Sequence, residues 1–191
     1  MSQRITGNYA LRGVQDMAAG FQFQADSFKF YCYYGAVDRF AEGTFTINGD
    51  TIVLKSSKEP GKDFTILKKE KAPTQFTVKV IEPNEFLAKY VMAIVVTGEK
   101  QEAFYPGKDG LIKVEAGNTS KIYLKHELYP DIPTLIRDEN EDFTYVEVKL
   151  NESLQQLSFK GIDLFIKEDD ELTWYPNYFI AAQNVRFIKG D

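Results

Sequence analysis

The chain has 191 residues, of which 43% are hydrophobic and 27% are charged, and this balance fits an ordinary globular protein of one large domain or two small ones. A net charge of -5 and a pI near 5.1 exclude the basic surface that holds nucleic acid or an anionic membrane, so neither is expected as a partner. The aromatic share of 14% favours strands, because flat side chains pack well on a pleated surface.

The first third of the chain alternates apolar and polar residues as antiparallel strands do. Ile5–Gly13 predicts a first strand, and Phe21–Ser57 continues with strands that turn near Ala25-Asp26-Ser27 and Gly35. Asn48-Gly49-Asp50 separates two alternating runs, and an Asn-Gly pair tolerates the positive φ of a tight hairpin. We therefore expect a hairpin at this point.

The segment Lys68–Thr74 follows a short predicted strand at Phe64–Leu67 and differs from it in composition. It contains a proline and a cluster of lysines, which is typical of a linker. The boundary placed here gives a first module at 1–70 and a second module at 75–191. The alternative is an ordinary charged hairpin within a single β-barrel of residues 1–191.

The second part of the chain also consists of predicted strands. The apolar run Tyr90–Val96 predicts a central strand covered on both faces. Leu111–Glu115 and Lys121–Lys125 are interpreted as a strand pair joined by Gly117-Asn118. Only Asn151–Gln156 has the pattern of a helical turn. Further strands are expected at Phe76–Ile81, Phe143–Leu150, Leu157–Phe159, Ile162–Ile166 and Val185–Ile188.

The fold class predicted from this pattern is all-β and antiparallel, with a partial barrel followed by a β-sandwich. The longest apolar run, Val91–Val96, falls far short of the ~18 residues of a membrane helix, so we expect a soluble protein without membrane insertion. No export signal is visible after Met1. The protein is therefore either cytoplasmic, or periplasmic or secreted if Met1 stands in place of a removed signal.

Part of the chain resembles a known kind of module. Gly7, Tyr9 and Leu11, followed by Gly43-Thr44-Phe45 and then Gly49–Leu54, resemble the strand pattern of bacterial lipocalin-like domains. This resemblance covers residues 1–70. It implies an antiparallel β-barrel module that has a binding or structural role and catalyses no reaction.

A second resemblance covers Gln75–Leu124. The valines Val78 and Val80, the central run Val91–Val95 and the turn at Gly107–Ile112 are similar to carboxypeptidase-regulatory-like, or transthyretin-like, β-sandwich modules. Taken together, the two resemblances imply a two-module β-protein of the kind found at the bacterial envelope.

Few residues are candidates for catalysis. His126 is the only histidine, and as a general base it would need an orienting carboxylate such as Glu127 or Asp131, but a polar residue at a strand edge is the commoner role. Cys32 is the only cysteine and lies in an apolar row, which predicts a buried, inert thiol. A zinc site needs several such ligands, and no phosphate-binding glycine loop occurs, so neither metal nor cofactor is expected.

Calcium is the one metal for which the sequence contains a partial motif. Asp138–Asp142 matches the first oxygens of a helix-loop-helix calcium loop, but Phe143 stands where glycine is needed and Lys149 where a bidentate glutamate should be. Two interpretations of this segment and of Glu168–Glu171 remain. Either segment could form a looser calcium site on the surface, or both are acidic hairpin tips exposed to solvent.

Aromatic residues are the candidates for ligand binding. Tyr31 and Tyr33 alternate with Phe28 and Phe30, so one row faces the core and the other lines a pocket or a surface. The run from Trp174 to Phe179 could stack on a sugar ring or anchor a partner protein, unless Trp174 and Phe179 plug the end of a barrel. The predicted ligand-binding residues are Tyr31, Tyr33, Tyr34, Trp174, Tyr175 and Tyr178.

The leading functional hypothesis is a non-enzymatic β-protein that binds a small apolar ligand, a sugar or a partner protein at the bacterial envelope. A concave, tyrosine-lined cavity would favour a small ligand, whereas a filled interior with an exposed apolar patch would favour association with a protein. The alternatives are a hydrolase that uses His126 with a nearby carboxylate, and a purely structural scaffold.

Overall fold

The protein is built almost entirely of β-strands in two compact units. One unit combines Met1–Glu59 with Gln155–Asp191, and the other is Pro60–Leu154. Within the described residues the only helices are α1 (Glu85–Ala88) and a 3-10 turn (Glu152–Gln155), and neither is long enough to cross a membrane. The computed structural model describes residues 5–72, 75–115, 117, 120–168 and 170–190.

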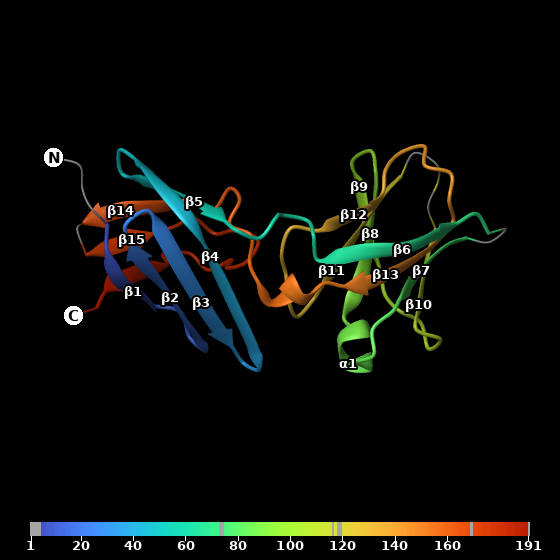
Figure 1. The fold of residues 1–191 in the computed structure, drawn as a ribbon, viewed down its shortest axis with the longest axis horizontal. Helices are drawn as coiled ribbons and strands as arrows, with labels where there is room; N and C mark the ends of the chain where they lie inside the picture. The colour runs from blue at the N-terminus through green and yellow to red at the C-terminus, as the bar shows by residue number, and fades with distance from the viewer. Residues whose placement is uncertain (1–4, 73–74, 116, 118–119, 169, 191) are drawn as a thin grey trace. The chain divides into compact units, whose positions relative to one another are not determined.

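The first unit is a closed barrel of eight antiparallel strands (Figure 1). The N-terminal strands β1 to β5 each pair with the next, β5 pairs with β14, and β16 returns to pair with β1. The two ends of the chain therefore close a single barrel. Its strands are β1 (Gly7–Arg12), β2 (Met17–Gln24), β3 (Ser27–Tyr34), β4 (Val37–Asn48), β5 (Thr51–Ser56), β14 (Leu164–Glu168), β15 (Glu171–Thr173) and β16 (Arg186–Lys189).

Aromatic side chains fill the barrel interior. Phe21 lies at the centre of this cluster, with ring centroids 4.6 Å from Phe30 and 5.0 Å from Phe187. Eight-stranded barrels are just wide enough to be filled by side chains or to hold one small ligand, and here side chains take the space. Other buried rings of the cluster belong to Tyr9, Phe23, Phe28, Phe45, Phe159 and Trp174.

The long strand β4 pairs with two neighbours, with β3 along its first part and with β5 along its last part. Gly43 lies where the two pairings overlap, opposite both Phe28 and Ser56. A Cβ at position 43 would lie 2.0 Å from the carbonyl oxygen of Lys55. Only glycine lets the strands approach this closely at the bend of the barrel.

The second unit is a β-sandwich of two four-stranded sheets, in the orders β10-β7-β13-β6 and β12-β11-β8-β9. Both sheets contribute to one buried apolar core, for example through Val78 and Val146 on one side and Ala93 and Leu124 on the other. All pairs are antiparallel except β7 with β13. The strands are β6 (Phe64–Glu70), β7 (Phe76–Val80), β8 (Val91–Thr97), β9 (Lys100–Phe104), β10 (Leu111–Val114), β11 (Lys121–His126), β12 (Thr134–Arg137) and β13 (Tyr145–Leu150).

The all-β class, the Asn-Gly hairpin and the central strand β8 agree with the sequence prediction. The barrel is closed rather than partial, because β14 to β16 complete it. The predicted pair at Leu111–Glu115 and Lys121–Lys125 does not form, since β10 pairs with β7 and β11 with β8 and β12. Asn118 of the turn predicted to join them lies outside the described residues.

The two units also divide at places that differ from the predicted boundary at 70–75. Lys68–Glu70 belongs to β6, which pairs with β13, and the expected linker residues 73–74 lie outside the described part. The predicted second module, 75–191, includes β14 to β16, which belong to the barrel. The sandwich is therefore an insertion between β5 and β14, two neighbouring strands of the barrel.

The geometry at the insertion point keeps the ends of each unit close together. In the barrel, the Lys58 ammonium donates to the carbonyl of Gln156 at 2.7 Å, and the amide of Phe159 donates to the hydroxyl of Ser56 at 2.7 Å. In the sandwich, the Asn151 amide donates to the carbonyl of Asp63 at 2.9 Å. The chain therefore enters and leaves each unit at neighbouring positions.

Candidate functional site

Tyr31 and Tyr33 of β3 lie on the outside of the barrel, while the alternating Phe28, Phe30 and Cys32 face its core. Tyr34 is the last residue of β3, falls in the same alternation as Cys32 and is 58% exposed at the strand end, so it is not part of the outer row. Tyr31 is 41% exposed and Tyr33 is 50% exposed. Their row therefore does not line an internal cavity. Of the two arrangements that the sequence allowed, the phenylalanines form the core.

Tyr31 has a structural role in this outer row. It lies opposite Gly20 on β2, and a Cβ at position 20 would come within 2.6 Å of the Tyr31 hydroxyl oxygen. The tyrosine ring thus covers the place where β2 has no side chain, as aromatic residues beside sheet glycines do. A hollow of about 510 Å³ beside Tyr31 is also lined by Gln22, Phe40 and Glu42.

A second hollow, the β14–β15 cleft, is formed by β14, β15 and the loop that follows them. It has a volume of about 530 Å³, within the range of about 300–1,000 Å³ that is usual for ligand sites. Its aromatic wall is made by Phe165 and Tyr175, whose rings meet edge to face at 5.0 Å. The residues that line it are Asp50, Phe165, Ile166, Lys167, Thr173, Trp174, Tyr175, Pro176, Gln183 and Asn184.

The strand pairing brings these residues together. The amide of Ile166 on β14 donates to the carbonyl of Asp50 at 2.8 Å, which sets the tip of the β4–β5 hairpin beside β14. The Thr173 hydroxyl donates to the carbonyl of Val185 at 2.5 Å and holds the end of β15 against the segment that carries Gln183 and Asn184. Three separate parts of the chain thus meet in one cleft.

Asn177 holds the loop that presents Tyr175. Its side-chain oxygen accepts from the amides of Phe179 and Ile180 at 3.0 and 2.9 Å, and its side-chain nitrogen donates to the carbonyl of Tyr175 at 3.2 Å. Asn residues often organise turns through such bonds. The Tyr175 ring, although 73% exposed, therefore stands on an ordered loop.

The predicted residues Trp174 and Tyr178 have different surroundings. Trp174 is 3% exposed and its ring packs against Phe187 with centroids 4.9 Å apart, so it belongs to the barrel core as the plug interpretation expected. It also lines the cleft. The Tyr178 hydroxyl donates to the carbonyl of Ser158, which ties its loop to the barrel.

The indole of Trp174 carries a buried donor. Among the residues that the structure describes, none accepts a hydrogen bond from its Nε1–H. Leaving a buried donor without an acceptor costs about 1–3 kcal/mol, and the indole ring is enclosed by the aromatic core of the barrel.

His126 is buried in the sandwich, not exposed at a strand edge as the sequence interpretation held. It lies on β11 between β12 and β8, with Nε2 3.1 Å from the carbonyl oxygen of Leu87 and its ring 5.1 Å from that of Tyr129. A general base must reach its substrate, and this ring has no exposed surface. The hydrolase hypothesis gains no support from its position.

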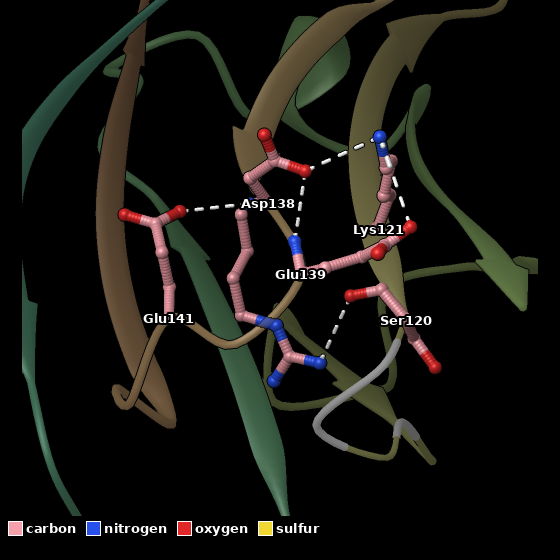
Figure 2. A network of polar contacts seen from close by, with 6 residues as sticks. Ser120, Lys121, Asp138, Glu139 and Glu141 are labelled. Carbon is pink, nitrogen blue, oxygen red and sulfur yellow. Dashed lines mark hydrogen bonds and ion pairs between the residues drawn. The ribbon is translucent and has the colours of Figure 1, made fainter.

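Carboxylates of the acidic segment 138–142 pair with lysines, of which Figure 2 shows Lys121 beside Asp138 and Glu139. The Lys121 ammonium lies 3.3 Å from the Asp138 carboxylate and 3.8 Å from that of Glu139. Glu141 pairs with Lys69 at 2.8 Å and accepts from the backbone amide of Asp138 at 2.7 Å, and these contacts lower the pKa of its carboxyl group. The carboxylates of Asp138, Glu139 and Glu141 are thus engaged with lysines of two strands, β11 and β6.

No group of three His, Cys, Asp or Glu side chains is placed to hold a metal ion in the part of the chain that the structure describes. The other acidic segment, Glu168–Glu171, contains Asp169, which lies outside the described residues.

Sequence reasoning identified Tyr175 but missed Asp50, Phe165, Gln183 and Asn184. The proximity of these residues depends on the pairing of β5 with β14, which local sequence patterns do not encode. Comparison with known protein families, with curated proteins and with solved structures gave no match for this chain.

Proposed function

We propose that the protein is a non-enzymatic binding protein that holds a small ligand in the β14–β15 cleft. The observation that carries this proposal is the meeting of a half-buried phenylalanine, Phe165, and an exposed tyrosine, Tyr175, with polar side chains from separate segments such as Asp50 and Asn184. Concave sites with aromatic walls and a few convergent polar groups are the usual form of a ligand site.

The filled barrel interior favours a site of this kind on the outside of the barrel. The closed eight-stranded barrel is compatible with the resemblance to bacterial lipocalin-like domains, and the two-sheet insert with the resemblance to transthyretin-like sandwiches. A place at the bacterial envelope, which these resemblances imply, is part of the proposal.

The test uses Trp174, the only tryptophan of the chain and a residue of the cleft wall, as a fluorescent reporter. Sugars, fatty acids and nucleosides are titrated into the full-length protein while its emission is followed. We expect at least one class to change the emission to saturation, and Tyr175→Ala to weaken that binding about tenfold, equivalent to about 1.4 kcal/mol.

Tyr34→Ala is the matched control, because Tyr34 is also an exposed tyrosine of the barrel but lies outside the cleft. It should leave the affinity unchanged. Binding that is lost in Tyr34→Ala and kept in Tyr175→Ala would move the site to the end of β3 that carries Tyr34, and the absence of any Tyr175-dependent signal would end the proposal.

A further inference from the structure

We infer that the ligand of the β14–β15 cleft is a neutral pyranose sugar, an inference that rests on the proposed function. The first argument is charge. The charged side chains that line the cleft are Asp50 and Lys167, one of each sign. A phosphate or carboxylate ligand would be attracted by the lysine and repelled by the aspartate. The lining therefore favours a ligand without net charge.

The second argument is polarity. Asp50, Gln183 and Asn184 are exposed at the cleft, and an apolar ligand would cover them without replacing their hydrogen bonds to water. Burying such groups without partners is unfavourable. The hydroxyl groups of a sugar supply both donors and acceptors to a carboxylate and two carboxamides.

The third argument is the shape of the aromatic wall. Phe165 and Tyr175 meet at an interplanar angle of 63°, so they do not form the parallel slot that would sandwich a planar base. A single exposed ring with polar groups beside it suits a ligand with one apolar face and a polar edge. A pyranose has this form, because its C–H bonds lie on a face and its hydroxyls project from the edge.

The experiment compares three kinds of probe on the full-length protein by calorimetry and by Trp174 emission. The sugar probes are the methyl glycosides of glucose, galactose, mannose and N-acetylglucosamine, together with an array of longer glycans. Dodecanoate is the apolar probe and adenosine the planar one. We expect binding by a sugar, and about a tenfold loss in Asp50→Asn, which keeps the size of the side chain and removes its charge.

Saturable binding of dodecanoate or adenosine that depends on Tyr175, with no binding of any sugar, would overturn the sugar assignment and leave the proposed function standing. No Tyr175-dependent binding of any probe would overturn both. An Asp50→Asn variant that binds the sugar unchanged would also count against the assignment, provided its urea unfolding matches that of the unaltered protein.

Discussion

At the scale of single residues, the aromatic core follows from the register of neighbouring strands. Phe21 is opposite Phe30, Phe23 is opposite Phe28, and Tyr9 is opposite Phe21 on the other side. Complete burial of a phenylalanine side chain is worth roughly 1.5–3 kcal/mol. The same rings that stabilise the barrel also occupy the space in which a ligand would otherwise lie.

Cys32 belongs to this core and gives a prediction about pH. Burial raises the pKa of its thiol to about 11, an effect that the nearby Arg39 guanidinium opposes. The ordinary pKa of a cysteine thiol is about 8.5. The folded state therefore favours the neutral thiol, and the stability from this group is complete below about pH 8.5 and is lost as the pH rises through about 11.

We expect the free energy of unfolding to fall between about pH 9 and 11, and to fall less steeply in Cys32→Ala. Urea unfolding followed by Trp174 emission at several pH values measures both slopes. Lysines and tyrosines titrate in the same range, so the difference between the two proteins is the informative quantity. Equal slopes would contradict the prediction.

At the scale of the element, Gly43 lets β4 pass from one neighbour to the next. We predict that Gly43→Ala destabilises the barrel by roughly 1–3 kcal/mol, because the new Cβ meets the backbone carbonyl of Lys55, which cannot move without shifting β5. Gly190→Ala is the control, since its Cβ would lie 3.9 Å from the nearest atom. Urea unfolding of the barrel should show a loss in the first variant and nearly none in the second.

Local patterns predicted many elements but not their partners. The Asn-Gly pair predicts its hairpin because the tight turn that it forms makes the strands on either side of it pair with each other. The short strands β12 and β15 were not predicted, since Thr134–Arg137 does not alternate apolar and polar residues and Glu171–Thr173 has only three residues. Lys68–Glu70 looked like a linker because the exposed end of an edge strand carries charges.

The same limit applies to the candidate site. Tyr175 could be identified from its aromatic-rich loop, whereas Asp50 is far from it in sequence and reaches the cleft only because β5 pairs with β14. The number of residues between these two strands gave no hint that they are neighbours. Because the sandwich is inserted between β5 and β14, local sequence patterns do not reveal that these two strands are neighbours.

At the scale of the whole molecule, the separate cores predict that each unit folds without the other. Removing Pro60–Leu154 and joining Glu59 to Gln155 through a short Gly-Ser linker should leave a folded barrel, because Lys58 and Gln156 already lie in contact. The isolated Pro60–Leu154 fragment should fold as well. Cooperative urea unfolding, with near-ultraviolet circular dichroism, is the measurement for both fragments.

A fragment of residues 1–70 serves as the contrasting case. It ends at the boundary suggested by composition and lacks β14 to β16, so it should not unfold cooperatively. Cooperative unfolding of this fragment, or its absence in the joined barrel, would contradict the assignment of the two units.

The closure of the barrel by β1 and β16 also sets an order of events during synthesis. Chains emerge from the ribosome N-terminus first, and completed domains fold as units. The sandwich can fold as soon as Leu154 has emerged, whereas β1 to β5 must wait for β14 to β16. Throughout that interval β1 and β5 are unpaired edges that can capture strands of other nascent chains. The protein should therefore depend on chaperones late in translation, and C-terminal truncation should send it into aggregates.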